Sequence, residues 1–548
     1  MNPGRRAPVP LVVAVLLAIA GGYLTRLAFP DPGWWPLAVV GVAAWVLAIA
    51  GRRPLVAAAL GLLYGLSFFV PLLHWSGVYV GAMPWLALSV LQAAYLALLS
   101  APAAWAVARP EWGRRRTLAS TAVLAGLWTA QEALRDRTPF GGFPWGRLAF
   151  SQADSPFVRL AFLGGAPLVT FAVAWSGAAL GTAVLVVLRR SDFSRPATVA
   201  TVAVAAGGLA VLVAASGLLV PLATGGTPTR VAGIQGDVPE AGLDFNAERR
   251  AVLDNHARVT TELARRVAAG TSPRPDVVIW PENASDLDPY QQADARQVID
   301  DAVDAIGVPT LVGAVLQRPV GFLTNASIVW EPGVGPTQLY AKRHPVPFGE
   351  YIPYRSFFRT FSAKVDLVRE DFVAGHVPGV LDLGPTRAGI AICFEVAYDD
   401  LVRDTVRGGA DLLVVQTNNA TFGYTDEAVQ QLAMSRLRAI EHGRSVAHVS
   451  TVGESALITP DGRVVARAGL FTPAVLEATL PLRTARTPAD RLGGWAELGL
   501  ALIGMLGCAA LFLGSRPGPR RWRLGSAPGD PTDNPVQDEA PIERAEAG

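Results

Sequence analysis

The chain has 548 residues, of which 51% are hydrophobic and only 17% charged, and its net charge is +2. Soluble domains commonly carry about 25% charged residues, so this deficit argues against a soluble protein and indicates a membrane protein. The small net charge and the scattered basic residues argue against nucleic-acid binding. The two cysteines, Cys393 and Cys508, lie in a polar segment and an apolar run, so we expect no disulfide between them and no structural zinc site.

Long apolar stretches fill the first 222 residues and return once near the C-terminus. About 20 apolar residues are needed to cross the hydrocarbon core of a bilayer, and most stretches reach that length. We therefore expect a membrane domain over 1–222 with about seven spans, and one more span over 492–514. The first span is predicted to be an anchor, because it lacks a clean signal-peptide cleavage site and six more spans follow. The stretches are 11–29, 34–50, 54–73, 84–108, 117–134, 158–188, 197–222 and 493–514.

Arginines cluster in alternate loops between these stretches, so all the clusters fall on one side of the membrane. Short arginine-rich loops mark the cytoplasmic side. The large segment 223–491 is therefore predicted to face outward. The remaining tail, 515–548, is rich in Pro, Gly and charged residues and is predicted to be disordered and cytoplasmic. The arginines concerned are Arg5, Arg6, Arg52, Arg53, Arg109, Arg114, Arg115, Arg116, Arg189, Arg190, Arg195, Arg516, Arg520, Arg521 and Arg523.

Within 223–491, short β-rich runs alternate with amphipathic helices. Several runs are continuously apolar, as expected for strands that are covered on both faces. This alternation predicts an α/β layered domain. The predicted strands are 230–235, 276–282, 310–315, 325–330, 387–393, 412–417, 445–450 and 456–460, and the predicted helices are 245–269, 289–306 and 425–442.

Three reactive side chains, those of Glu282, Lys342 and Cys393, come at or just after the ends of strand-like segments. Open α/β folds present their sites at such ends. The carboxylate can take the thiol proton to make the nucleophilic thiolate, and the ammonium can stabilise an oxyanion and lower the pKa of the thiol. Each residue also has a plainer interpretation. A cysteine after an apolar strand is commonly a small buried hydrophobe, while the glutamate can cap a turn and the lysine can be solvated.

The segments around these residues resemble the nitrilase superfamily. They read VVIWPEN at 277–283, YAKRHPVPFGEYIP at 340–353 and AICFE at 391–395, in the order Glu, Lys, Cys. A fourth segment, QEALRDRTPFGGFPWGRLAFSQ at 131–152, is similar to the membrane-proximal segment of one member, the apolipoprotein N-acyltransferase family. Together the four motifs resemble that family over nearly the whole chain except the tail.

The resemblance implies a multi-pass helical membrane domain joined to an αββα sandwich. It implies that Glu282 is the general base, Lys342 the oxyanion stabiliser and Cys393 the nucleophile, while Glu350 and Glu395 order Lys342 and the cysteine loop.

The resemblance also implies lipid contacts, for which Trp280, Phe394 and Trp145 are the candidate residues. In the loop 418–423, Thr421 stands where the family carries an aromatic residue, which is expected to alter lipid contacts or loop mobility.

The implied reaction is a ping-pong acyl transfer through a cysteine thioester. The donor is a membrane phospholipid, and the acceptor is the α-amino group of the diacylglyceryl-modified N-terminal cysteine of a lipoprotein. We expect a monomer in the plasma membrane, with no metal or diffusible cofactor.

Two alternatives remain open on the sequence. One is a membrane-anchored amidase that uses the same three residues on a small amide. The other is a transporter with a non-catalytic external domain, for which charges inside the spans are expected. The N-terminal stretches have almost none in their interiors, apart from Glu132 near the end of a span, which argues against a transporter. His344 and His442 are interpreted as surface or supporting residues.

Overall fold

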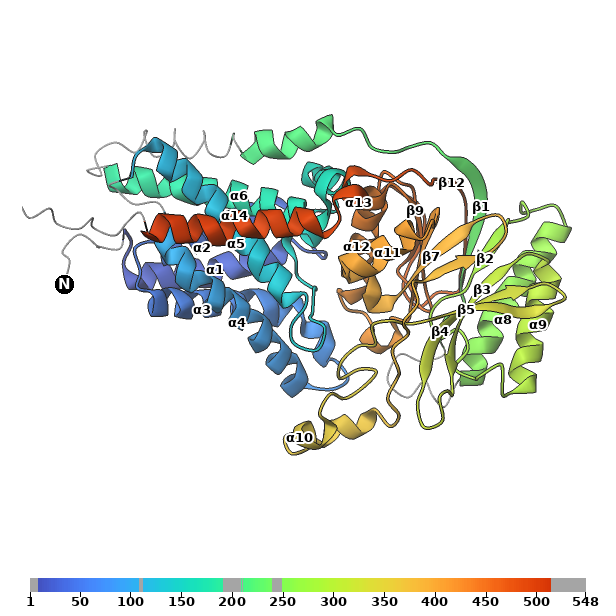
Figure 1. The fold of residues 1–548 in the computed structure, drawn as a ribbon. Coiled ribbons are helices and arrows are strands. Elements are labelled where there is room, and N and C mark those ends of the chain that lie inside the picture. Colours follow the sequence, from blue (N-terminus) through green and yellow to red (C-terminus); the bar gives the residue numbers. More distant parts are fainter. Residues whose placement is uncertain (1–7, 108–111, 191–207, 209, 239–248, 514–548) are drawn as a thin grey trace, which may run out of the picture.

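The computed structural model describes residues 8–107, 112–190, 208, 210–238 and 249–513. In this part of the chain, a bundle of apolar helices lies end-on against a layered α/β domain (Figure 1). The predicted tail 515–548 and much of the predicted span 197–222 lie outside the described residues. So do several of the clustered arginines, namely Arg5, Arg6, Arg109, Arg195, Arg516, Arg520, Arg521 and Arg523.

The helical bundle follows the predicted apolar stretches. Among the described residues, four helical segments are long and apolar enough to cross a membrane: 54–72, 82–106, 156–188 and 494–513. The first two helices are shorter, and the fifth is less apolar, because it begins with arginines and contains Gln131 and Glu132 near its end. The helices are α1 (Leu11–Leu27), α2 (Pro36–Ile49), α3 (Pro54–Leu72), α4 (Ala82–Ala106), α5 (Arg114–Arg135), α6 (Ala161–Arg190, kinked at Gly164 and Gly165) and α14 (Gly494–Leu513).

The last helix, α14, returns from the α/β domain and packs along α5 (Figure 1). A Cβ atom on Gly504 of α14 would lie only 2.1 Å from the backbone nitrogen of Leu127 in α5. Apolar membrane helices associate largely through such close backbone contact between small residues. The glycine therefore makes the C-terminal helix part of the bundle.

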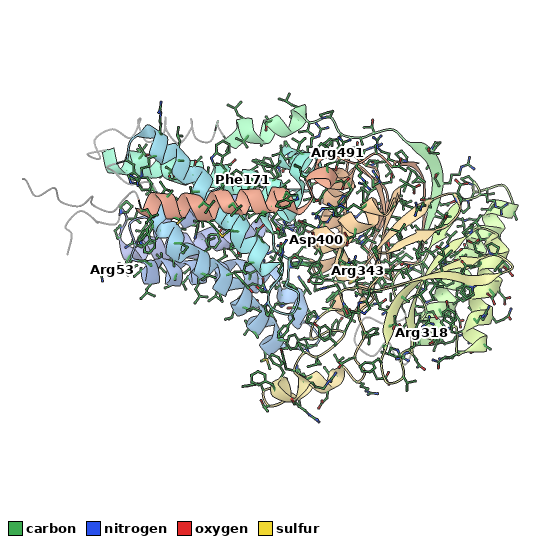
Figure 2. All side chains as sticks on the ribbon, viewed as in Figure 1. Arg53, Phe171, Arg318, Arg343, Asp400 and Arg491 are labelled. Carbon is green, nitrogen blue, oxygen red and sulfur yellow. The ribbon has the colours of Figure 1, made fainter. Side chains whose placement is uncertain are left out.

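The described arginine-bearing loops lie at one end of the bundle. Figure 2 shows Arg53 at the end of the bundle farthest from the α/β domain, whereas Arg491 lies at the junction. Arg52 donates to the carbonyl of Val9 (2.6 Å), and Arg116 donates to the carbonyl of Leu511 near the end of α14 (3.0 Å). These contacts bring the loop after α2 beside the start of α1, and the start of α5 beside the end of α14.

The α/β domain contains two six-stranded sheets, in the strand orders β12-β1-β2-β3-β4-β5 and β11-β10-β9-β8-β7-β6. Parallel pairing joins β1 to β2 to β3 and β7 to β8 to β9, while the outer strands pair antiparallel. The strands are β1 (Thr227–Gln235), β2 (Val277–Ile279), β3 (Thr310–Leu316), β4 (Thr324–Glu331), β5 (Gly335–Ala341), β6 (Val380–Asp382), β7 (Arg387–Ile392), β8 (Leu412–Thr417), β9 (Ser445–Ser450), β10 (Ser455–Ile458), β11 (Val464–Ala468) and β12 (Ala474–Leu482).

The two sheets pack face to face, and helices cover both outer faces. One core joins the sheets, with Ile279 and Val329 on one side and Ile390 and Val414 on the other. The outer face of the first sheet is covered by α8 (Arg249–Ala268) and α9 (Ala293–Ile306). The second sheet is covered by α11 (Asp399–Arg407) and α12 (Glu427–His442), and α12 also packs against α6 of the bundle. The predicted αββα sandwich is therefore confirmed.

All eight predicted strands and all three predicted helices of this domain are present, although their ends differ by a few residues, and the first four residues of the predicted helix 245–269 lie outside the described residues. Four strands escaped the prediction, namely β5, β6, β11 and β12. Two of these, β5 and β11, are only partly buried and contain no long apolar run.

Candidate active site

The candidate nucleophile, Cys393, occupies a sharp turn directly after β7. Its φ angle is +54°, and it opens a short 3-10 turn, Cys393–Ala397. This left-handed conformation is unfavourable for a residue with a side chain, and such strain collects at functional sites. The residue as a whole is partly exposed, and Nε2 of Gln431 in α12 lies 3.6 Å from its sulfur. The turn thus presents the thiol between the end of β7 and α12.

Lys342, directly after β5, lies between two carboxylates. Its Nζ is 3.2 Å from Oε1 of Glu282 and 2.9 Å from Oε1 of Glu350, and its side chain is buried. Nδ2 of Asn325, at the start of β4, donates to the same two oxygens at 2.6 Å and 3.0 Å. The three charged groups therefore form one buried unit with a single amide bridging the carboxylates.

Glu282 lies three residues beyond the end of β2. Pro281, just before it, has no backbone N–H and so cannot continue the hydrogen bonding of the strand. The backbone passes close to β3 here, because a Cβ on Gly313 would lie 2.1 Å from the carbonyl oxygen of Pro281. Asn283 has a φ of +53°, and the N–H of Asn418 after β8 donates to Oε2 of Glu282 at 2.9 Å. Contacts from three strands thus hold one carboxylate in place.

The electrostatics favour a protonated thiol and a charged lysine in the resting site. Burial raises the pKa of Cys393, the Glu282 carboxylate raises it further, and Lys342 opposes both. The expected lowering of the thiol pKa by Lys342 is thus outweighed by burial. Burial by itself would lower the pKa of Lys342, but Glu282 and Glu350 outweigh it and keep the ammonium charged. Burial also raises the pKa of Glu282, so its carboxyl is a stronger base than an exposed one.

Glu395 connects the lysine segment to the cysteine turn. Its fully buried carboxylate accepts hydrogen bonds from the hydroxyl of Tyr340 (2.9 Å) and from the N–H groups of Arg343 (2.7 Å), His344 (3.1 Å) and Ile392 (2.8 Å). Among the described residues, Lys342 Nζ donates to Glu282 and Glu350 and not to Glu395. Glu395 therefore fixes backbone on both sides of the site, whereas Glu350 contacts the lysine itself.

A second buried network holds the end of the cysteine turn against the bundle. Arg438 of α12 donates to the carbonyls of Val396 (2.8 Å) and Ala397 (2.9 Å) and pairs with Asp399 (2.7 Å). Arg147 pairs with the same Asp399 at 2.9 Å. The turn that carries the thiol is thus tied to a residue of the membrane-proximal segment.

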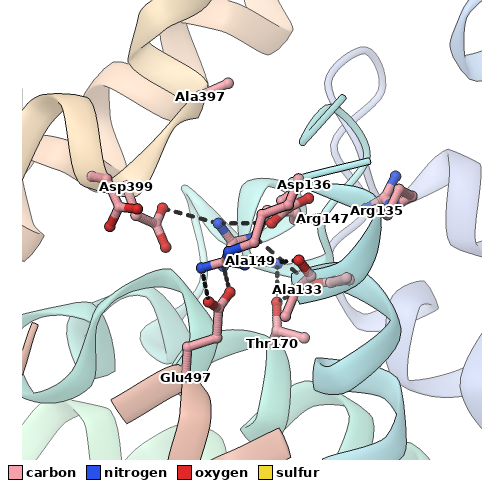
Figure 3. A network of polar contacts seen from close by, with 12 residues as sticks. Ala133, Arg135, Asp136, Arg147, Ala149, Thr170, Ala397, Asp399 and Glu497 are labelled. Atoms are coloured by element: carbon pink, nitrogen blue, oxygen red, sulfur yellow. Dashed lines mark hydrogen bonds and ion pairs between the residues drawn. The ribbon is translucent and has the colours of Figure 1, made fainter. Parts of the chain in front are cut away.

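Figure 3 shows Arg147 pointing into a group of carboxylates from separate elements. Besides Asp399, it lies 3.2 Å from Asp136, 3.8 Å from Glu132 and 3.9 Å from Glu497 of α14. Glu132 also accepts from the hydroxyl of Thr170 in α6 at 2.8 Å. The one acidic residue predicted near the end of a span is therefore part of an interdomain ion network.

The candidate lipid-contact residues fall into two groups. Phe394 stacks on Trp145 with ring centroids 5.9 Å apart and on Phe143 at 5.3 Å, so the membrane-proximal segment touches the residue next to Cys393. Trp280, in contrast, lies in the protein core. It is fully buried between the first sheet and α8, where its indole N–H donates to Thr260. The indole of Trp280 is therefore enclosed by protein, which does not favour the expected contact with acyl chains.

Thr421, which replaces an expected aromatic residue, lies in a short 3-10 turn, Ala420–Phe422. Its neighbour Phe422 packs edge-on against Trp75, which in turn lies 5.0 Å from Trp145. An aromatic contact between this loop and the bundle is thus made by the next residue.

The two histidines differ from each other. His442 is fully buried and contacts Asp490 at 2.6 Å, so of the two interpretations, surface or supporting residue, the burial rules out the first. His344 stacks on Tyr398, and burial followed by the charge of Lys342 lowers its pKa to about 4, so the ring is neutral at pH 7. Among the residues that the structure describes, no group of His, Cys, Asp or Glu is arranged to hold a metal ion.

Several residues at the site were not predicted from the sequence, namely Asn325, Tyr340, Gln431 and Glu427. Asn325 had a local signal, because it is a polar residue at the start of an apolar strand. Composition also draws attention to Lys342, because Lys342 and Lys364 are the only lysines in the chain. No local pattern in the sequence indicates Gln431 or Glu427 on α12, because only the packing of α12 turns these side chains towards the thiol.

Comparisons with known sequences agree with this architecture. The profile described as apolipoprotein N-acyltransferase N-terminal domain matches residues 21–179, and the carbon-nitrogen hydrolase profile matches residues 230–489. An amidase of known structure from Nesterenkonia sp. is 18% identical and covers 48% of this chain and 93% of its own, with a TM-score of 0.34.

Three curated relatives of this chain are named apolipoprotein N-acyltransferase. The protein from Mycolicibacterium smegmatis is 40% identical over 401 residues, which span 69% of this chain and 66% of that relative. The protein from Azotobacter vinelandii is 32% identical over 74% of this chain and 76% of its own length. The protein from Pseudomonas syringae pv. tomato is 30% identical over 91% of this chain and 95% of its own. This chain belongs to the apolipoprotein N-acyltransferase family.

Proposed function

We propose that this chain transfers a fatty acyl group from a membrane phospholipid to the α-amino group of the diacylglyceryl-modified N-terminal cysteine of a lipoprotein. The name shared by its relatives supports this acceptor. The observation that carries the proposal is the aromatic stack of Phe143 and Trp145 on Phe394, next to the thiol. A membrane-proximal segment in contact with the nucleophile turn suits a donor that stays in the bilayer.

In the first half-reaction, Glu282 takes the proton of the Cys393 thiol, and the thiolate attacks an ester carbonyl of the phospholipid. Lys342 stabilises the oxyanion of the tetrahedral intermediate. The C–O bond then breaks, and the proton on Glu282 passes to the departing lysophospholipid. The products are a cysteine thioester and a lysophospholipid. Because the resting thiol is protonated, the base has to act at the moment of attack.

In the second half-reaction, the α-amino nitrogen of the acceptor attacks the thioester carbonyl. Glu282 takes a proton from that nitrogen and returns it to the departing Cys393 thiolate. Lys342 again stabilises the oxyanion. Water would hydrolyse an exposed thioester, so an apolar surrounding favours transfer over hydrolysis. The reaction needs no metal or diffusible cofactor, and a single chain contains every group it uses.

We also propose a plasma-membrane location with the α/β domain outside the cytoplasm. The arginine loops support this orientation, because positively charged short loops stay on the cytoplasmic side. Reporters fused after Arg116 should read cytoplasmic, and a reporter near Thr227 should read external. A cytoplasmic signal at residue 227 would overturn the orientation.

The test of the reaction separates donor from acceptor. Purified protein is mixed with phospholipid vesicles and digested, and mass spectrometry is used to find a fatty acyl group on Cys393. A synthetic diacylglyceryl lipopeptide is then added, and its N-terminal amide is measured. Hydrolysis of small amides without any acyl-enzyme from phospholipid would instead support a membrane-anchored amidase.

A further inference from the structure

Glu427, the first residue of α12, is a buried carboxyl without a visible purpose in the fold. The residue is 2% exposed, and its Oε2 has no hydrogen-bond partner among the described residues. Removing a carboxyl from water without a compensating partner is costly. A buried polar atom of this kind points to a group that is absent from the resting molecule.

The position of Glu427 indicates what it faces. Gln431 lies four residues later on α12, and residues with that spacing lie on the same face of a helix. Since Gln431 Nε2 lies 3.6 Å from Cys393 Sγ, this face is turned towards the thiol. The preceding residue, Asp426, points elsewhere and pairs with Arg26 of α1.

The charges around Glu427 agree with this position. Burial and then the nearby Glu282 raise the pKa of Glu427 to about 8, and Glu427 is among the groups that raise the pKa of Cys393. Lys342 is engaged with Glu282 and Glu350 instead. Glu427 is therefore close enough to Glu282 and Cys393 for the charges of these groups to act on one another.

The transfer step leaves one proton without an acceptor. An α-amino group has a pKa of about 8, so at neutral pH the lipoprotein N-terminus arrives mostly as an ammonium. Forming an amide from that ammonium removes two protons from the nitrogen. Glu282 takes the second and passes it to the departing thiolate. The first has to leave before the nitrogen can attack, because an ammonium has no free electron pair.

We propose that Glu427 binds the α-ammonium of the acceptor and takes the first of its two protons. This inference rests on the proposed acyl transfer to an amine. The N–H bond breaks towards Glu427, the freed electron pair attacks the thioester carbonyl, and the C–S bond breaks as Glu282 takes the second proton. Glu427 gives its proton to water after the product leaves. At pH 7 the resting Glu427 carboxyl is mostly protonated. The arriving ammonium lowers its pKa, so the carboxyl first releases its own proton to water and then accepts one from the nitrogen.

The test measures the two half-reactions separately in Glu427→Gln. Thioester formation from phospholipid should be at least as fast as in the wild type, because Glu427 is among the groups that raise the pKa of Cys393. Transfer to a diacylglyceryl lipopeptide should fall at least about tenfold at pH 7, because only about one-tenth of an amine with a pKa near 8 is unprotonated there. The deficit should disappear above pH 9. Hydroxylamine, which is uncharged at pH 7, should remove the acyl group equally fast from both proteins.

A matched control is Asp294→Asn, which removes a carboxylate from the first turn of α9 on the far side of the domain. It should leave both half-reactions unchanged. Folding of the Glu427 variant is checked by thermal unfolding. Because the folded pKa is raised, the wild-type carboxyl costs stability as the pH rises from about 4.5 to about 8. The variant should therefore gain stability relative to wild type across that window.

Each result decides one point. Transfer by Glu427→Gln at the wild-type rate at pH 7, with an unchanged pH profile, would overturn this role while leaving the acyltransferase proposal intact. Loss of thioester formation in the variant would also overturn it, since Glu427 would then act in the first half-reaction. Absence of any thioester in the wild-type protein would instead refute the proposed function itself.

Discussion

Replacing Lys342 by methionine is the sharpest single perturbation of the proposed site. Methionine has a similar length and fills the space, but it removes the ammonium that lies 3.2 Å from Glu282 and 2.9 Å from Glu350. Two buried carboxylates then remain, joined only through the amide of Asn325. Breaking a buried ion pair by removing one partner costs about 3–5 kcal/mol of stability.

The loss of rate follows from two effects with the same sign. Loss of one oxyanion donor commonly costs about 10²–10³ in rate. In addition, burial raises the pKa of Glu282 and Lys342 is the main group that lowers it, so the variant base is protonated up to a higher pH. We therefore expect thioester formation to fall at least 10²-fold at pH 7 and to recover in part as the pH rises. Arginine at position 342 should not restore it, since a planar fork does not replace a compact ammonium.

The assay is single-turnover formation of the acyl-enzyme from phospholipid, followed by mass spectrometry across a pH series. The chain offers a matched control, because Lys364 is its only other lysine and lies exposed beside the carbonyl of Val80. Lys364→Met should form the thioester at the wild-type rate. A folded Lys342→Met protein that forms the thioester at nearly the wild-type rate would refute the oxyanion role of this lysine.

Three further predictions concern the cysteines, the two carboxylates and the interdomain network. Cys393→Ala should form no acyl-enzyme and Cys393→Ser almost none, because a hydroxyl ionises far less readily than a thiol, whereas Cys508→Ala should keep near-normal activity. Glu282→Gln should block acylation while phospholipid binding persists, and Glu350→Gln should cost less, because it contacts the lysine and not the thiol; single-turnover rates distinguish the two. Arg147→Gln should lower the free energy of unfolding by about 3–5 kcal/mol, since it leaves carboxylates buried without their cation; thermal or denaturant unfolding measures this.

The arginine prediction has a control on the surface. Arg250 pairs with Asp254 at 2.8 Å and Asp294 at 2.6 Å, but all three side chains are largely exposed. Arg250→Gln should therefore change stability by no more than about 1 kcal/mol. Equal losses in Arg147→Gln and Arg250→Gln would contradict the importance of burial. Equal loss of activity in the two cysteine variants, or a near wild-type rate for Glu282→Gln, would contradict the assigned roles.

Much of the architecture follows from local sequence, because its signals are local. The length of each apolar run predicts where the bundle helices lie, and continuous apolar runs predict the covered strands. The strands that were not predicted, such as β5 and β11, read GPTQLYA and VVARA, which contain neither a long apolar run nor a sustained apolar–polar alternation. The motifs around Glu282, Lys342 and Cys393 likewise identify the family from short segments.

Side-chain direction and partnership depend on the folded chain. Trp280 lies two residues before Glu282, yet its ring enters the core under α8, because the backbone leaves the strand between them. Asn325 bridges carboxylates 43 and 25 residues away in sequence, and no local pattern records such a pairing. The residues themselves determined the membrane helices, the α/β layers and the reactive groups. Only the tertiary structure decided which side chains meet, since contacts at strand ends and across α12 join segments far apart in the chain.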